Sequence, residues 1–325
     1  MAYEFLAVGV ALLFFGSESL LRGGIGIFKS FGLSPLLIGL VVVAAATSAP
    51  EFAVTMQALA NKTPEMAVGS IIGADLINLL LLAGLGALIR PLPSPPKIAF
   101  RDGSAMLLST VALGGIVAFG AFNRRTGLVL LAGFFAYLAV AFISDWRRTT
   151  QLSVSEARAQ CREHNSSDGL NVFLIVLGIV SLFFGARCLV DGVLSIAPAL
   201  HMTGDLAGLT IVALATALPE IVVVFGMTMR GWDSVTIGSL LATSIFNILA
   251  VLGIAALVHP FRLSGGFVHF DAYILAGTAV LLLPLMITSW RLTRWNGALL
   301  LLCYAGYCAL LAARLGYLPM PFAVT

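Results

Sequence analysis

The chain has 325 residues, of which 60% are hydrophobic and only 10% charged, and its formal net charge is +3. A soluble globular domain carries about a quarter charged residues, so this composition excludes an ordinary water-soluble fold. The small net charge gives no indication of a nucleic-acid partner, and the expected surroundings are membrane lipids.

Apolar runs bounded by glycine, proline and charged residues recur along the whole chain. Each is about 20 residues long, which is enough to cross a ~30 Å hydrocarbon core as a helix. The runs are continuously apolar rather than alternating, which favours helices over barrel strands. The predicted fold class is an all-α polytopic membrane protein with about ten transmembrane helices, near residues 3–22, 35–58, 66–89, 103–121, 127–145, 171–196, 205–228, 235–258, 268–288 and 295–315.

The one strongly polar stretch, residues 146–169, divides the predicted helices into five and five. We therefore expect a first half at 1–145 with its core at 35–91, a linker loop at 146–170, and a second half at 171–325 with its core at 204–260. With the linker in the cytoplasm, twelve Lys and Arg residues fall on the inside and five on the outside, Arg314 among the five. The positive-inside rule then places both termini outside, in the plasma or inner membrane of the cell.

An internal repeat appears when the chain is shifted by 169 positions. The shift aligns, without a gap, Gly16 with Gly185, Thr47-x-x-Pro50-Glu51 with Thr216-x-x-Pro219-Glu220, Gly69-Ser70 with Gly238-Ser239, and Asn78 with Asn247. Five helices precede the second copy, so the two copies enter the membrane in opposite directions. The sequence thus predicts two inverted five-helix repeats, the architecture of a secondary transporter.

The candidate site lies in the middle of the second and seventh helices, where Pro50 and Pro219 are each followed by a glutamate. Proline removes one amide donor and frees a carbonyl about one turn earlier, so backbone oxygens near Ala44 and Ala213 are expected to face a ligand. Carboxylate, hydroxyl, amide and carbonyl oxygens suit a hard cation such as Ca²⁺ or Na⁺. The first set of predicted ligands is Glu51, Glu220, Thr47, Thr216, Asn78, Asn247, Ala44 and Ala213.

A single intramembrane glutamate can be protonated and hydrogen-bonded, a single proline can be only a kink, and a lone asparagine is more often a contact between helices. Burying a carboxylate in a membrane costs on the order of a few kcal/mol. Two glutamates at repeat-equivalent positions, each after a proline and a threonine, therefore favour function over structure.

These residues resemble the α-repeats of the cation/calcium exchanger superfamily, whose best-known branch is the sodium/calcium exchangers. The matching motifs are Thr47–Glu51 with Gly73–Asn78, and Thr216–Glu220 with Ala242–Asn247. The resemblance implies ten helices with outside termini, a central pair of glutamates that binds Ca²⁺, and antiport against Na⁺ by alternating access through sliding of the first and sixth helices. No cofactor is implied, and the partners are inorganic cations.

The sequence also departs from the family pattern at places where the family uses hydroxyls to hold sodium. Ala74 and Ala217 replace two serines, and Asp75 stands where the family usually has asparagine. The second-copy position that often holds Asp is Asn247. Hydroxyls remain at Ser48 and Thr243. Calcium binding is the safer implication, while H⁺ or another cation in place of Na⁺ stays open.

The first and sixth helices carry mirror-image charge pairs at the spacing i, i+4, because Glu18 aligns with Arg187 and Arg22 with Asp191. Intramembrane charges are normally neutralised by a partner. We predict a structural or gating role for these four residues, near the helix ends, rather than cation binding.

Other classes of function find less support. The four cysteines show no metal-binding spacing, and no disulfide is expected. No HExxH or Gly-rich phosphate loop indicates an enzyme, and a channel has no need of proline-broken inverted repeats. The oligomeric state stays open, with a monomer plausible.

Overall fold

A computed structural model describes residues 2–30, 44–146, 167–200, 202–229, 233–264 and 266–315. Residues 35–43 of the predicted second span and 147–166 of the predicted linker lie outside these ranges. Within the described residues, eight helices are long and apolar enough to cross a membrane. Gly204–Thr216 and Leu218–Met229 meet the same criteria when taken together, with a bend of 47° between them, and are called the bent span below. The predicted class of a helical, multi-pass membrane protein is confirmed.

The first half contains α1 (Ala2–Ser30), α3 (Ala44–Thr47), α4 (Ala49–Ala60), α5 (Pro64–Leu76), the π-helix η2 (Ile77–Leu82), α6 (Ala83–Ile89), β1 (Leu92–Pro93), α7 (Pro96–Ile98), the π-helix η3 (Ala99–Gly103), α8 (Ser104–Phe119), β2 (Ala121–Phe122) and α9 (Arg124–Trp146). Where both are described, helices and predicted spans mostly agree within a few residues. The exceptions are α1, which continues eight residues past 22, and the fourth span, whose helix begins at Pro96 rather than 103.

The second half contains α11 (Asp168–Ile196), α12 (Gly204–Ala207), the π-helix η4 (Gly208–Val212), α13 (Ala213–Thr216), α14 (Leu218–Met229), α15 (Asp233–Phe246), the π-helix η5 (Asn247–Val251), α16 (Leu252–Val258), β3 (Phe261–Arg262), α17 (Phe267–Thr288), β4 (Arg291–Leu292) and α18 (Arg294–Arg314). From α13 onward, the order of elements follows that of the first half from α3 onward, except that α7 and η3 precede α8 and have no separate counterpart before α17.

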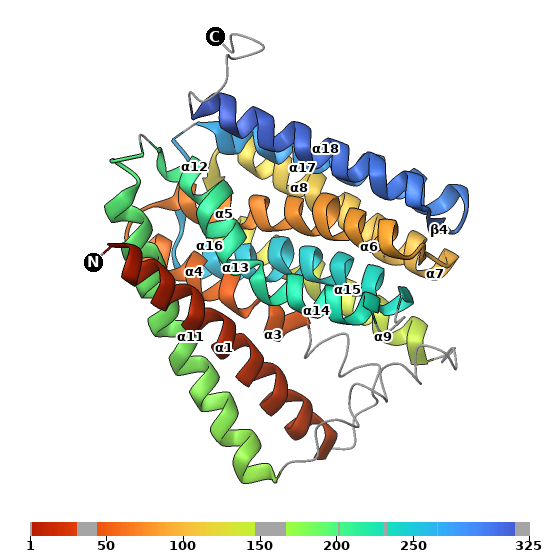
Figure 1. Ribbon diagram of the computed structural model, residues 1–325, viewed down its shortest axis with the longest axis horizontal. Helices are drawn as coiled ribbons and strands as arrows, with labels where there is room; N and C mark the ends of the chain where they lie inside the picture. Colours follow the sequence, from red (N-terminus) through yellow and green to blue (C-terminus); the bar gives the residue numbers. More distant parts are fainter. Residues whose placement is uncertain are drawn as a thin grey trace.

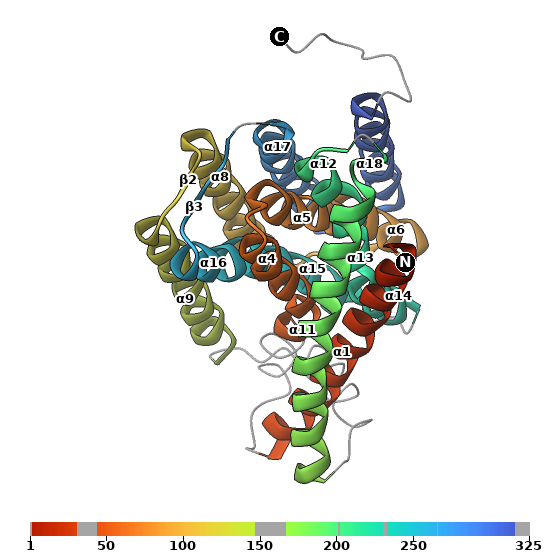
Figure 2. The same cartoon turned by 90° about the vertical axis from the view of Figure 1, so that its left-hand side faces the viewer.

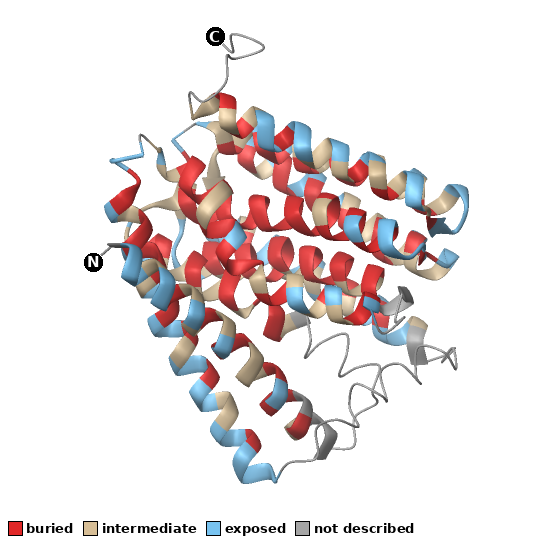
Figure 3. Ribbon diagram, viewed as in Figure 1, coloured by how far each residue is buried: buried red, intermediate tan, exposed pale blue. Residues whose placement is uncertain are grey.

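Two spans form the centre of the molecule. In Pro64–Ile89 and Thr236–Val258, 83% and 78% of the apolar window is buried, whereas the other six spans bury 22–44%. Figure 3 shows the central helices almost entirely buried and the outer helices buried on one face. Large apolar side chains cover the outer faces, among them Phe15, Phe119, Leu128 and Trp295. This arrangement suits a protein whose outer helices contact lipid.

Helices α1 and α11 pack side by side along one edge of the molecule (Figures 1 and 2). The repeat-equivalent Gly16 and Gly185 lie in this contact. A Cβ atom on Gly16 would lie 3.0 Å from the Leu182 amide nitrogen, and one on Gly185 would lie 2.9 Å from that of Leu13. The two backbones therefore lie so close together that only glycine, which has no Cβ atom, fits at these positions.

Short antiparallel strand pairs connect the halves. Strand β1 pairs with β4, with Leu92 opposite Leu292, and β2 pairs with β3, with Phe122 opposite Phe261. The rings of Phe122 and Phe261 stack with their centroids 4.6 Å apart. Each half thus contributes one strand to each pair, which holds the loops of the two halves together.

Candidate functional site

The helix breaks predicted at the two prolines are present. Ser48 separates α3 from α4, and Ala217 separates α13 from α14. Because Pro50 has no amide proton, the carbonyl four residues earlier loses its helical donor. That carbonyl belongs to Ala46, and it accepts a hydrogen bond of 2.7 Å from the Ser17 hydroxyl of α1. The break is therefore stabilised by a neighbouring helix.

The structure shows the surroundings of the backbone oxygens near Ala44 and Ala213, whose role as ligands stays a prediction. The Ala213 carbonyl accepts the Ala217 amide at 3.0 Å and the Thr216 hydroxyl at 3.3 Å, so it is engaged within its own turn. In the first half, the carbonyl freed by proline is that of Ala46, two residues after Ala44, and the Ser17 hydroxyl donates a hydrogen bond to it. Hydroxyl groups thus compete with a ligand for the carbonyls at each broken turn.

Glu51 and Glu220 lie in the first turn after each break, and both are buried. Their charges interact with each other, and each glutamate also interacts with the threonine of the other half: Glu51 with Thr216, and Glu220 with Thr47. Neither carboxylate oxygen of Glu220 makes a hydrogen bond of ordinary geometry, and Oε2 of Glu51 makes none. Two acids from opposite halves thus interact with each other, and three of their carboxylate oxygens remain able to accept a hydrogen bond or bind a cation.

Asp75 joins these acids from the central helix α5. It is fully buried, and its charge interacts with those of Glu51 and Glu220. Its Oδ1 accepts a hydrogen bond of 3.0 Å from Nδ2 of Asn247, a residue 172 positions away in the other half. The Ser244 side chain also interacts with Asp75. The relocated acid and the asparagine at the usual acid position therefore bind each other directly.

Asn78 and Asn247 lie at the beginning of two π-helical segments, η2 and η5. Single π-helical turns occur often at functional sites, because they displace the side chains around them. The Oδ1 atoms of both asparagines are buried and have no hydrogen-bond partner. Both amides are therefore placed to offer an oxygen to a ligand.

The hydroxyl positions of the site differ between the halves. Ser48 and Thr243 are buried, and the Ser48 hydroxyl has no partner. Ala74 and Ala217 are fully buried and offer no hydroxyl. Ser244, which the sequence reasoning did not select, has a buried hydroxyl without a partner beside Asp75.

Chemically, the site is a buried collection of oxygen atoms that lack donors. Buried polar groups are usually satisfied, and several acceptors left unpaired together indicate that something else supplies the positive charge. Among the residues that the structure describes, no three Asp, Glu, His or Cys side chains converge closely enough to hold a metal ion by themselves. A cation here would need the amide and hydroxyl oxygens as well as the acids.

The four charges predicted on the first and sixth helices pair locally. Nε of Arg22 lies 2.6 Å from Oε1 of Glu18, and Nε of Arg187 lies 3.8 Å from Oδ2 of Asp191. Asp191 also accepts a hydrogen bond of 3.1 Å from Asn61, the residue that follows α4. Glu18 and Arg22 do not lie near a helix end, because α1 continues to Ser30. Their structural or gating role stays a prediction.

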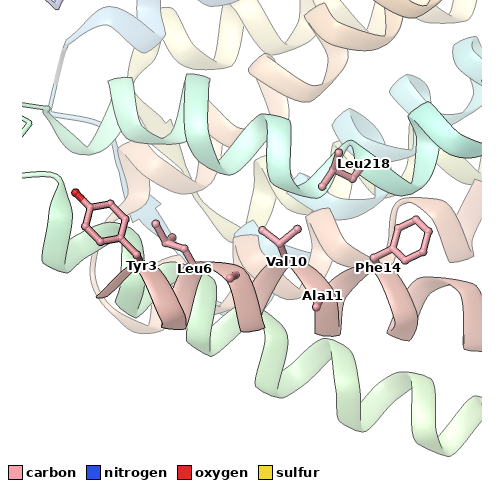
Figure 4. Close-up of a pocket in the computed structure, with 7 residues that line it drawn as sticks. Tyr3, Leu6, Val10, Ala11, Phe14 and Leu218 are labelled. Atoms are coloured by element: carbon pink, nitrogen blue, oxygen red, sulfur yellow. The ribbon is translucent and has the colours of Figure 1, made fainter. Parts of the chain in front are cut away.

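An open apolar groove of about 620 Å³ runs along α1 beside the bent span (Figure 4). It is lined by Tyr3, Leu6, Ala7, Val10, Ala11, Phe14 and Leu218. None of the three site carboxylates lines it, so this groove is not part of the cation site.

One basic residue differs from its expected place. Arg314 was counted with the outside loops, but its side chain is only 4% exposed, and its Nη1 lies 2.6 Å from Oδ2 of Asp271 in α17. The partners are 43 residues apart, so local sequence gave no indication of the pair.

Comparison with known proteins identifies the class to which this membrane protein belongs. The family described as sodium/calcium exchanger protein matches residues 2–143 and 170–313. The chain belongs to this family, and the resemblance inferred from its motifs is confirmed.

Two similar curated proteins are the putative antiporter CaxA of Alkalimonas amylolytica, 30% identical over 96% of this chain and 98% of that one, and the inner membrane protein YrbG of Escherichia coli, 32% identical over 80% and 81%. Sodium/calcium exchanger MaX1 of Methanosarcina acetivorans is 26% identical over 94% and 97%. Among solved structures, the sodium-calcium exchanger NCX_Mj soaked with Na⁺ and Ca²⁺ is 25% identical, with a TM-score of 0.65 over 95% of this chain and 97% of that one.

Proposed function

We propose that this protein is a secondary antiporter that moves Ca²⁺, or a similar hard cation, across the cell membrane in exchange for Na⁺. The observation that carries the proposal is the meeting of Glu51 and Glu220, buried acids from opposite halves, with unpaired oxygens. Two buried carboxylates repel each other and are costly in a membrane. A divalent cation bound between them removes both penalties, and relatives named as exchangers agree with this chemistry.

The proposed architecture is ten spans arranged as two inverted repeats, with both termini outside and the linker in the cytoplasm. Supporting observations are the family match in each half and the strand pairs exchanged between halves. The beginning of α1 and the end of α18 also lie at the same side of the molecule, on the left in Figure 1, as an even number of spans requires.

The proposed mechanism is alternating access, in which α1 and α11 slide together past the central helices. Gly16 packs against Leu182 of α11 and Gly185 packs against Leu13 of α1, so the two helices are in close contact and can move as one unit. The Ser17 hydroxyl on the Ala46 carbonyl connects that unit to the helix break beside Glu51. Movement of α1 would therefore displace the helix break beside Glu51 through this hydrogen bond.

The coupling ion has a second candidate. Asp75 brings a third carboxylate to the site, and Ala74 and Ala217 supply no hydroxyl that would hold Na⁺. This composition favours H⁺, or a cation other than Na⁺, as an alternative counter-ion. Uptake of ⁴⁵Ca²⁺ into proteoliposomes, driven separately by a Na⁺ gradient and by a pH step, distinguishes the two.

The same assay tests the site. Glu51→Gln and Glu220→Gln are each expected to abolish gradient-driven ⁴⁵Ca²⁺ uptake while the protein still elutes as a folded species, because each removes a charge that the ion must meet at low dielectric. Glu4→Gln, an exposed glutamate in the first turn of α1, is the matched control and should transport normally. Parental uptake by Glu51→Gln or Glu220→Gln would refute the proposed site.

A further inference from the structure

A carboxylate far from the cation site fastens the beginning of the bent span to another helix. Oδ2 of Asp205, in the first turn of α12, accepts the backbone N–H of Phe267 at 2.7 Å. Oδ1 of Asp205 accepts the Leu206 amide at 2.9 Å and the Thr203 hydroxyl. Phe267 is the first residue of α17, where amides have no helical partner and a negative charge is favoured. The contact is thus a charge-assisted cap between two helices.

The backbone at Gly266 is shaped for this contact. Its φ is +99°, a backbone conformation that residues with a side chain rarely adopt. A Cβ atom there would lie 2.6 Å from Oδ2 of Asp205. Any larger residue at 266 would therefore push the carboxylate away from the Phe267 amide.

The helix that receives the cap is itself fixed in place. Asp271, one turn after Phe267, forms the buried ion pair with Arg314 of α18. The preceding loop is held by Glu65 of α5, whose Oε1 accepts the Ser264 amide at 3.1 Å and the Ser264 hydroxyl at 2.5 Å. The elements α12, α17 and the end of α18 meet at the upper left of Figure 1. Asp205 therefore connects the bent span to a helix, α17, that is itself fixed by contacts with α5 and α18.

The sequence of the repeat-equivalent segment lacks both residues of this cap, and its first part, residues 31–43, lies outside the described residues. At the offset of 169, Asp205 corresponds to Leu36, which carries no carboxylate, and Gly266 corresponds to Lys97. In an inverted-repeat transporter, identical halves would make the states open at either end equal in energy. A contact whose residues only the second half supplies makes opening of its own end more costly.

We propose that Asp205 is a latch that holds the α12 end of the bent span closed and so biases the protein toward conformations open at the opposite end. The inference rests on the proposed alternating access and adds one motion to the sliding of α1 and α11, namely that the α12 end of the bent span moves away from α17 when this end opens. Hydrogen bonds to charged groups are strong enough to shift such an equilibrium by about tenfold or more.

The test measures cysteine accessibility in the purified full-length protein, with the native cysteines replaced. The reporters are Leu209→Cys in η4, near the latch, and Ala87→Cys near the opposite end of the central span; both side chains are buried. Asp205→Leu, which installs the residue found at position 36, should raise the maleimide labelling rate at 209 about tenfold and lower it at 87. Asp168→Leu, an exposed acid in the first turn of α11, should change neither rate.

Two further variants keep the test decisive if Asp205→Leu does not fold. Asp205→Asn keeps an acceptor without the charge and should give a smaller shift in the same direction, and Gly266→Ala should act like Asp205→Leu. Unchanged labelling in these variants, or faster labelling at both reporters together, overturns the latch. Labelling needs no transport, so normal ⁴⁵Ca²⁺ uptake by Glu51→Gln would refute the cation site without deciding this result.

Discussion

The ion pair between Asp271 and Arg314 gives a quantitative prediction about stability. The Arg314 side chain is 4% exposed, that of Asp271 is 0% exposed, and the interacting atoms are 2.6 Å apart. The guanidinium carbon also lies 4.5 Å from the Phe267 ring centroid and 5.3 Å from that of Phe270. Arg314→Ala therefore leaves a buried carboxylate without a cation and removes a packed group, and a loss of about 3–5 kcal/mol in the free energy of unfolding is expected.

An exposed pair in the same protein serves as the comparison. Glu18 and Arg22 are 38% and 56% exposed, and pairs of this kind contribute roughly 0.2–1 kcal/mol. Reversible unfolding in detergent, followed by circular dichroism against denaturant, measures both. Asp271→Leu with Arg314→Met should regain most of the loss, because an apolar pair of similar volume needs no charge compensation. A loss below about 1 kcal/mol in Arg314→Ala would show that the pair is hydrated and that our account of it is wrong.

Two other predictions concern the counter-ion and the local charge pairs. Ala74→Ser with Ala217→Ser should increase the Na⁺ dependence of ⁴⁵Ca²⁺ uptake, since each adds a hydroxyl at a buried position of the site; Na⁺ and pH profiles identical to those of the parent would contradict this. A double-mutant cycle, measured on folded yield, should show coupling between Arg187 and Asp191 but not between Arg187 and Glu18. The reason is that the structure pairs each charge with a partner on its own helix. Coupling between Arg187 and Glu18 instead would mean that the charges pair between α1 and α11.

Much of the architecture was available from the sequence because the membrane imposes simple rules. Hydrocarbon thickness fixes the length of a span and excludes unpaired backbone, so apolar runs gave most of the described helices within a few residues, with α1 and the fourth span as exceptions. The repeat placed Glu51 and Glu220 at equivalent positions, and proline predicted a helix break before each. These properties depend on residues that are near one another in the chain or related by one fixed offset.

The tertiary structure decided which partners those residues find. Ser17 reaches the Ala46 carbonyl, Asn247 reaches Asp75, and Arg314 reaches Asp271. Each partner lies 29 or more positions away, at a distance that no helical periodicity encodes.

The same reason explains what the sequence reasoning could not supply. Proline dictates that a carbonyl is freed, but only the packing of α1 determines that Ser17 takes it. An arginine at the end of a span is expected to extend its side chain into water. A buried carboxylate on a neighbouring helix, which sequence alone does not reveal, can neutralise the guanidinium inside the protein instead. The sequence by itself therefore determined the spans, the repeat and the acids, whereas tertiary packing determined which charges and carbonyls are already satisfied and which remain for a ligand.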